Sequence, residues 1–390
     1  MRGRALAARL GVLVPTLFAC TATSSVAPPF EPVPEPRPSD VAAVLLLVGD
    51  AGDAVLEASP LLHRLRADVE RWSGALAEEG AVAVAFLGDN VYPEGVRSRG
   101  ASGFARDSAL LHGQVSTVSG AAARAHGTRG LFVAGNHDWG NLPGQAGLAR
   151  LRNMEALLTR LAASGPLVEL VPRAGDPGPV IVELGSAARL VVLDTPWWLQ
   201  ADDRDPRKDT LIDEVASALA RTDGPVPIVL AHHPYASGGP HGGHRVPLTP
   251  KWLLHKAGAL VQDLNSRPYR RLRERLGDVF ERAGAPTVFA GGHDHSLQVH
   301  RGSSAREPAW MLVSGAGSHV TPVGEAPGLT WSAPAAGYMS LVFGDDGRVD
   351  LYVIAAPPEV LECPAGRATT EACVREGVSA FRAMFSARLR

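Results

Sequence analysis

The sequence carries almost no net charge, because its 38 lysines and arginines nearly balance its 40 aspartates and glutamates. A formal charge of −2 at pH 7 gives no electrostatic field that would attract nucleic acid or a membrane surface. Binding to nucleic acid is therefore not expected. Disorder is excluded for most of the chain, because 45% of its 390 residues are hydrophobic, which is ample for one large α/β domain. The sequence also has no internal repeat.

The apolar run nearest the N-terminus, residues 10–18, is too short to span a bilayer. Arg2, Arg4 and Arg9 precede or begin it, and this pattern predicts a signal peptide over residues 1–19 and an exported protein. Residues 17–20 resemble the bacterial lipobox, whose cysteine is acylated. We therefore expect an envelope lipoprotein, periplasmic or on the outer surface, anchored to the membrane by a lipid at Cys20. Cleavage without a lipid, giving a secreted protein, is the alternative.

Cysteine is scarce, with three residues in the whole chain. Cys363 and Cys373 lie close together, and an oxidising exported setting favours a disulfide between them over two free thiols. Residues 20–40 contain six prolines and are expected to form a semi-rigid linker. The predicted organisation is thus a signal peptide, this linker, a folded domain over residues 41–356, and a C-terminal tail over residues 357–390 that carries the disulfide.

Several short apolar runs stop abruptly at aspartate, asparagine or histidine. They cover residues 41–48, 81–87, 131–134, 190–193, 228–231 and 287–290. Such runs are typical of strands buried on both faces, and helical segments lie between several of them. Residues 59–79 give the best helix, with Ser59 as N-cap and Pro60 at the first helical position. The alternation predicts an α/β sheet whose polar strand ends gather at one site.

The later part of the chain has apolar runs without long helices between them, at residues 311–313, 339–343 and 349–354. This pattern predicts a second, partly antiparallel sheet packed on the first. The fold class expected from the residues is therefore an α/β sandwich.

The strand ends carry oxygen and nitrogen donors that could hold two metal ions. They are Asp50, Asp89, Asn136, His232, His293 and His295. Two metals about 3.5–4 Å apart can bind a phosphate and lower the pKa of a bridging water toward neutrality. Such a set predicts in-line attack of hydroxide on phosphorus. Side chains two apart in an extended segment point the same way, so His293 and His295 can serve neighbouring metals.

The motifs around these donors resemble those of the calcineurin-like metallophosphoesterases. In the family's order they are GDAG at 49–52, GDNVY at 88–92, GNHD at 135–138, HHP at 232–234 and GGHDH at 291–295. The resemblance spans about residues 41–355 and implies a four-layer α/β sandwich of two mixed sheets flanked by helices. Most members have a histidine where this chain has Gly52. In purple acid phosphatases of the tartrate-resistant type a tyrosine compensates, and Tyr92 occupies its place.

By that resemblance the donors divide into two metal sites that share Asp89. An Fe(III) site takes Asp50, Asp89, Tyr92 and His295, since a phenolate favours Fe(III). A site for divalent Fe, Zn or Mn takes Asp89, Asn136, His232 and His293. The alternatives are that Asp53 replaces Asp50 as the ligand, and that Tyr92 is an ordinary buried tyrosine.

Further residues are candidates for catalysis by the same resemblance. His137 is similar to the family's histidine that contacts phosphate oxygens or protonates the leaving group, and Asp138 would orient it. His241, in the glycine-rich loop of residues 237–243, corresponds to a second such histidine, with His244 in reserve. An imidazole suits this role because its ordinary pKa of about 6.5 allows it to carry a proton at mildly acid pH.

Other conspicuous residues receive a structural interpretation. His233 is expected to face away from the metals, and His319 to be a surface or core histidine. The arginine-rich helix over residues 269–283 is a solvated face in the simplest reading, or supplies one arginine to a substrate phosphate. Residues 240–281 have no counterpart in the motifs.

The function expected first is hydrolysis of small phosphate monoesters by an acid phosphatase-like enzyme. A phosphodiesterase or nucleotide pyrophosphatase on the same site is the second interpretation. The third is a surface lipoprotein that binds metals without turnover, and the complete donor set with His137 speaks against it.

Overall fold

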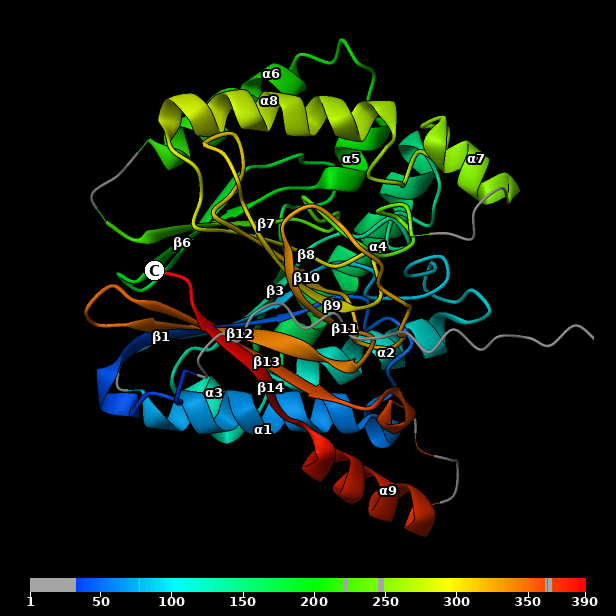
Figure 1. Cartoon of the computed structure of the whole chain (residues 1–390). Coiled ribbons are helices and arrows are strands. Elements are labelled where there is room, and N and C mark those ends of the chain that lie inside the picture. The colour runs from blue at the N-terminus through cyan, green and yellow to red at the C-terminus, as the bar shows by residue number, and fades with distance from the viewer. Residues whose placement is uncertain (1–32, 77, 221–223, 245–248, 362, 364–366) are drawn as a thin grey trace, which may run out of the picture.

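Two seven-stranded sheets lie face to face and carry helices on their outer surfaces in the computed structural model (Figure 1). It describes residues 33–390 except 77, 221–223, 245–248, 362 and 364–366. The first sheet has the order β14-β13-β12-β1-β2-β3-β4. Its strands are β1 (Val41–Val48), β2 (Val82–Phe86), β3 (Arg129–Phe132), β4 (Leu167–Leu170), β12 (Ala336–Gly344), β13 (Val349–Ala356) and β14 (Arg382–Arg388).

The second sheet has the order β11-β9-β10-β8-β7-β6-β5. Its strands are β5 (Val180–Leu184), β6 (Ala188–Val192), β7 (Val226–Leu230), β8 (Val288–Gly291), β9 (Leu297–Arg301), β10 (Trp310–Ser314) and β11 (Leu329–Ala333). Both sheets are mixed, since each contains parallel and antiparallel pairs. The predicted fold class, an α/β sandwich of two mixed sheets flanked by helices, is confirmed.

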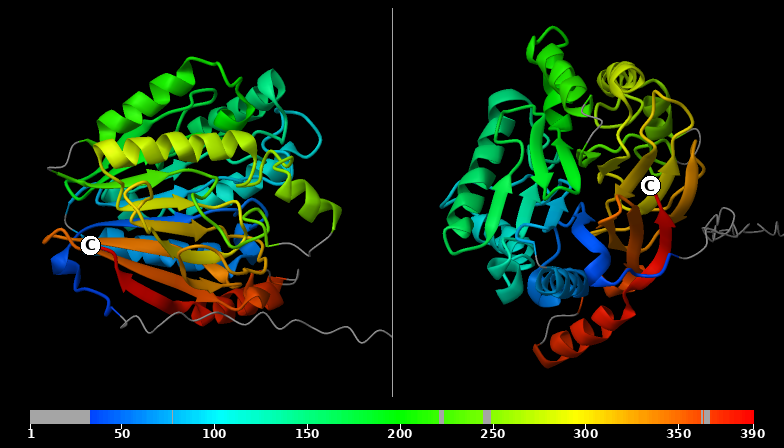
Figure 2. Two further views of the ribbon diagram at one scale, coloured as in Figure 1. Left: turned by 45° about the horizontal axis from the view of Figure 1, so that its top comes forward. Right: turned by 90° about the vertical axis from the view of Figure 1, so that its left-hand side faces the viewer.

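Helices cover the outer face of each sheet (Figures 1 and 2). Those on the first sheet are α1 (Pro60–Ala75), α2 (Phe104–Ser116), α3 (Ala121–Ala125), α4 (Gly144–Ala162) and α9 (Arg367–Ala380). Those on the second are α5 (Thr195–Gln200), α6 (Arg207–Leu219) and α8 (Arg267–Ala283), while α7 (Pro250–Lys256) projects at the side. Short 3₁₀ helices are η1 (Pro38–Asp40), η2 (Leu56–Ala58) and η3 (Pro358–Val360).

The alternation of side chains along β1 explains why this strand has no polar residue. Leu45 and Leu47 face the second sheet and belong to the core between the sheets, whereas Val44 and Leu46 belong to the core under the helices. All four are at most 1% exposed. A central strand with helices on one face and a sheet on the other must be apolar throughout.

Helix α1 begins as predicted but ends earlier. The Ser59 hydroxyl accepts a hydrogen bond from the backbone N–H of Leu62 (3.3 Å), and Pro60 is the first helical residue. The predicted helix over residues 59–79 is wrong at its end, because Leu76 is already extended and buries its side chain in the core.

The division of strands between the sheets also differs from the prediction. The strands expected to form a late second sheet separate, since β12 and β13 join β1 in the first sheet while β10 lies in the second. The expected C-terminal tail is likewise not separate, because β14 pairs with β13 and α9 packs against α1. Within it, Cys363 and Cys373 form a disulfide.

The predicted signal peptide and Cys20 lie outside the described residues, as does most of the linker. Among the residues that the structure does describe, no helix has the length and apolar character needed to cross a membrane.

Candidate metal centre

The predicted metal-binding residues lie at strand ends of both sheets and meet in one place. Those after β1, β2 and β3 are Asp50, Asp89, Tyr92 and Asn136. Those after β7 and between β8 and β9 are His232, His293 and His295.

Several of these residues have a backbone conformation that is rare outside glycine. The φ angle is +58° at Asp50, +54° at Asp89 and +68° at His293. In the described part of the chain only one other non-glycine residue has a positive φ, Asn141 at +53°. Such conformations cost on the order of 1–3 kcal/mol and cluster at functional sites. The strained backbone therefore distinguishes these strand ends from ordinary turns.

Two imidazoles of the centre face each other through nitrogen lone pairs. Nδ1 of His232 contacts the carbonyl oxygen of Leu87 (2.9 Å), and Nε2 of His293 contacts that of Gln262 (2.8 Å). A carbonyl oxygen only accepts, so these nitrogens donate and the other nitrogen of each neutral ring carries a lone pair. These lone-pair nitrogens, Nε2 of His232 and Nδ1 of His293, are 3.1 Å apart. Burial lowers the pKa of both rings and keeps them neutral.

Two oxygen acceptors complete this group. Oδ1 of Asn136 lies 2.9 Å from Nε2 of His232, and its orientation is set because the Asn136 amide nitrogen donates to Asn141 (2.8 Å). Oδ1 of Asp89 lies 3.5 Å from the same Nε2. Ligand atoms of Asp89, His232 and His293 all lie within 4.8 Å of one another. Lone pairs of four side chains converge here, and a cation would stabilise that arrangement.

A second group surrounds the Tyr92 hydroxyl. The hydroxyl oxygen lies 3.1 Å from Oδ1 of Asp50, 3.2 Å from Oδ2 of Asp89 and 3.1 Å from Nε2 of His295. Burial and the charges of the two carboxylates raise the pKa of Tyr92 well above its usual value, and a bound cation would oppose that effect. Oδ1 of Asp89 faces the imidazole group and Oδ2 faces the Tyr92 hydroxyl, so this one carboxylate contacts both groups.

The lack of space around Gly52 explains why this chain has Tyr92 at the centre and no histidine at position 52. A Cβ at Gly52 would lie 2.5 Å from the carbonyl oxygen of Asp89 and 2.9 Å from Cδ2 of Tyr92. A histidine side chain at this position is therefore incompatible with the place that Tyr92 occupies. Asp53, the alternative to Asp50, instead pairs with His319 (2.8 Å) and Arg106 (2.5 Å).

His137 lies beside the Tyr92 group, with ring centroids 4.6 Å apart. Its Nδ1 contacts the carbonyl oxygen of Pro93 (2.6 Å), and Nε2 lies 3.9 Å from Oδ2 of Asp89. The ring is thus held by a backbone carbonyl and turns Nε2 toward the centre.

Asp138 does not orient His137, contrary to the prediction. Its buried carboxylate accepts hydrogen bonds from the backbone N–H groups of Asn90, Val91 and Gly135, and so ties the loops after β2 and β3 together. Burial, together with the charge of Asp89, raises the pKa of Asp138 to about 7.

His241 reaches the centre from the glycine-rich loop. Its ring centroid lies 4.0 Å from that of His293, and its backbone N–H donates to Oδ1 of Asp294 (2.9 Å). The reserve candidate His244 is exposed and lies beside Gly324. The geometry therefore favours His241 over His244.

Some residues near the centre were missed in the sequence. Asn141 orients Asn136, and Gln262 fixes the His293 ring. His319 is not an unrelated histidine, because its ring lies 5.5 Å from that of Tyr92 and 5.4 Å from that of His295. Its position shortly after β10, another apolar run, was a usable signal. His233 is buried and bonded at both ring nitrogens, in agreement with its structural interpretation.

A two-sheet α/β sandwich with carboxylates, imidazoles and a tyrosine hydroxyl gathered at its strand ends is the arrangement of a class of phosphoesterases. A family model described as calcineurin-like phosphoesterase matches residues 45–297. The chain belongs to this family.

Solved structures share the fold at low sequence identity. One, described as GAP50, the anchor in the inner membrane complex of Plasmodium, has a TM-score of 0.51 and 12% identity over 87% of this chain and 95% of that one. The purple acid phosphatase PPD1 from yellow lupin (Lupinus luteus) seeds has a TM-score of 0.53 and 14% identity over 84% of this chain. This chain covers only 53% of the lupin protein. No curated protein matches the chain.

Proposed function

We propose that the protein hydrolyses small phosphate monoesters at a dinuclear centre, in the manner of purple acid phosphatases. The carrying observation is that Asp89 faces two acceptor groups, one around the Tyr92 hydroxyl and one made by Asn136, His232 and His293. We assign Fe(III) to the group of Asp50, Asp89, Tyr92 and His295, and divalent Fe, Zn or Mn to the other. Metals in such a pair polarise a phosphate and activate a water.

Two histidines beside the centre, His137 and His241, would contact the substrate. Nε2 of His137 is directed at the centre from the Tyr92 side, and His241 lies against His293 on the other side. Both side chains are partly exposed, at 30% and 33%, so a substrate can reach them. We assign them to phosphate binding and to protonation of the leaving group.

Metal analysis combined with an absorption spectrum and a pair of assays tests the proposal. We expect two metals per chain including iron, a visible tyrosinate-to-iron band, and turnover of 4-nitrophenyl phosphate. Asn136→Ala should lower kcat/KM by about 100-fold or more, because even outer partners of a ligand are worth about 10–100-fold. Substitution of the exposed His112 on α2 by glutamine is the control. A protein with two metals and no monoesterase activity at acid to neutral pH contradicts the proposal.

Faster turnover of bis(4-nitrophenyl) phosphate than of the monoester would instead support the phosphodiesterase interpretation. The same centre can serve either ester class, so the ratio of the two rates decides between them.

A role without catalysis is the second candidate, motivated by the likeness to a Plasmodium structure described as an anchor. It predicts that metals bind and stabilise the fold while neither ester is cleaved. Retention of metals with loss of activity in His137→Gln speaks against this role, because only an enzyme has activity to lose.

We further propose export and acylation at Cys20, which places the protein on the bacterial envelope. Mass spectrometry of the mature N-terminus should find a lipid on Cys20, and Cys20→Ala should release the protein from the membrane fraction. An unmodified N-terminus in the soluble fraction would indicate secretion instead.

A further inference from the structure

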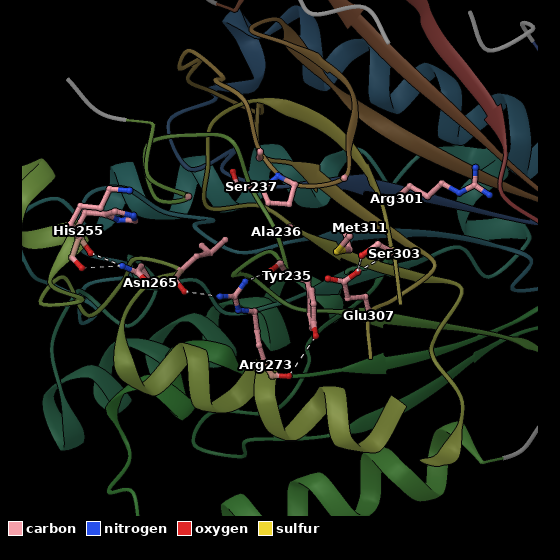
Figure 3. A pocket seen from close by; sticks show the side chains of 16 residues that line it. Tyr235, Ala236, Ser237, His255, Asn265, Arg273, Arg301, Ser303, Glu307 and Met311 are labelled. Atoms are coloured by element: carbon pink, nitrogen blue, oxygen red, sulfur yellow. Dashed lines mark hydrogen bonds between the residues drawn. The ribbon is translucent and has the colours of Figure 1, made fainter. Parts of the chain in front are cut away.

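A buried carboxylate outside the family motifs lies between two histidines. Asp263 is 2% exposed and belongs to the segment that joins α7 to α8. Its Oδ1 lies 2.7 Å from Nδ1 of His241, and its Oδ2 lies 2.8 Å from Nδ1 of His255. His255 lines a cavity of about 390 Å³ together with Asn265 and Arg273 (Figure 3). One carboxylate thus connects the ring beside the metal centre to a ring on the cavity wall.

Backbone contacts hold Asp263 against this site. The N–H of the following residue, Leu264, donates to the carbonyl oxygen of His241 (3.1 Å). The carbonyl oxygen of the preceding residue, Gln262, accepts from Nε2 of the predicted ligand His293 (2.8 Å). The Asp263 carboxylate is therefore placed by its own segment, and exchanging it for an amide leaves these backbone bonds intact.

The two short contacts determine how the His241 ring is protonated. An ionised carboxylate can only accept hydrogen bonds, so Nδ1 of His241 must carry the hydrogen that it donates to Asp263. Nε2 is then the nitrogen through which His241 acts on a bound ester. Carboxylates and carbonyls commonly fix the tautomer and orientation of functional histidines in this way.

We propose that Asp263 is a positioning residue for His241, an inference that rests on the proposed hydrolase function. It holds the ring against the centre in the Nδ1–H form, so that Nε2 meets the leaving-group oxygen. For catalysis the ring also carries a proton at Nε2 while Nδ1–H stays bonded to Asp263. As the water oxygen bonds to phosphorus, the bond from phosphorus to the leaving oxygen breaks, and that oxygen takes the proton from Nε2. The ring is left in the neutral Nδ1–H form, and the phosphate product keeps the protons of the water. Asp263 remains ionised throughout.

The first test reads the tautomer in the full chain without added metal. Long-range ¹H–¹⁵N NMR of histidine-labelled protein separates Nδ1–H from Nε2–H rings, and His241→Gln assigns the signal. We expect the Nδ1–H form in the wild type. Asp263→Asn should give a mixture, because one amide can accept from only one of the two rings. An Nε2–H ring at His241 in the wild type overturns the proposal.

The second test compares leaving groups. Asp263→Asn should lower kcat for ethyl phosphate by about 10–100-fold, and much less for 4-nitrophenyl phosphate, whose leaving group needs little protonation. Metal content should stay at the wild-type level. His255→Gln should cost much less, because the contact between Asp263 and His241 remains. Asp350→Asn, which alters a buried carboxylate on β13 paired with Arg388, controls for the loss of a buried charge.

Equal losses with both esters, or an equal loss in His255→Gln, would assign Asp263 a purely structural role and overturn the proposal. A wild type that cleaves neither ester would refute the proposed hydrolase function instead. The NMR measurement would still test Asp263 in that case.

Discussion

Gly52 is required by space rather than by backbone freedom. An added Cβ would meet main-chain atoms of Asp89 and Tyr92, at 2.5 Å and 2.9 Å, and these cannot move as the end of a side chain can. Gly52→Ala should therefore destabilise the protein by about 1–3 kcal/mol and displace the Asp89 carboxylate. Chemical unfolding and metal content measure the two effects.

The matched control is Gly74→Ala on the exposed face of α1, where the nearest atom to an added Cβ is a side-chain carbon at 3.6 Å. Alanine there should stabilise the protein by about 0.5–1 kcal/mol, since glycine is unfavourable within a helix. Equal effects of the two substitutions would show that the crowding at Gly52 has no energetic consequence.

The hydroxyl of Tyr92 is not needed for the packing of its ring. Tyr92→Phe should keep the packing but remove the oxygen that lies within 3.2 Å of Asp50, Asp89 and His295. We expect loss of the visible band, reduced iron content and about a 100-fold loss of activity, as for other groups that hold a metal. Tyr235→Phe is the control, because it removes a hydroxyl that donates to the carbonyl oxygen of Arg306 instead. A visible band that survives Tyr92→Phe excludes phenolate ligation.

At the scale of elements, the sequence predicted the inner strands and missed the edges. The unpredicted strands β4, β5, β11 and β14 are the four edge strands of the two sheets, and β9 is the fifth unpredicted strand. In β4 and β5, buried and more exposed side chains alternate, so neither contains a continuous apolar run. The sequence also could not show which strands share a sheet, because β1 pairs with β12 from the far end of the chain.

At the centre, too, some residues could be predicted from the sequence and others could not. The convergence of the metal-binding candidates could be predicted because most of them follow an apolar strand closely and parallel strand ends share an edge. The contact between Asp263 and His241 could not be predicted, because it depends on how two loops meet. The backbone N–H of Leu264 donates to the carbonyl oxygen of His241 and holds the loops together. The role expected of Asp138 was wrong because adjacency in sequence does not imply a contact between side chains.

The N-terminus of α1 permits a prediction at this scale. Ser59 is 1% exposed, and its hydroxyl caps the backbone N–H of Leu62. Ser59→Ala should lower the free energy of unfolding by about 1 kcal/mol, whereas Ser59→Gly should cost only a few tenths. Urea unfolding of the two variants checks this order. Equal stability of Ser59→Ala and the wild type would mean that the cap contributes nothing.

At the scale of the whole molecule, the centre joins the two sheets. Asp50, Asp89 and Asn136 follow strands of the first sheet, whereas His232 and His293 follow strands of the second. Hydrophobic packing between the sheets, from Leu45 and its neighbours, does not depend on metal. Cations at the strand ends would add a link at one edge of this interface.

Metal removal should therefore lower global stability without unfolding the protein. A ligand that binds only the folded state adds RT ln(1 + [L]/Kd), about 2.7 kcal/mol at a hundredfold excess over Kd. We expect dialysis against a chelator to lower the melting temperature, readdition of iron and zinc to restore it, and the circular dichroism spectrum of the folded state to persist. Asp89→Ala should melt at the same temperature with and without metal, because it removes the carboxylate that contacts both groups and that we propose as their shared ligand. If that variant responds to metal as the wild type does, the stabilising ions bind elsewhere and the sheets are not linked through Asp89.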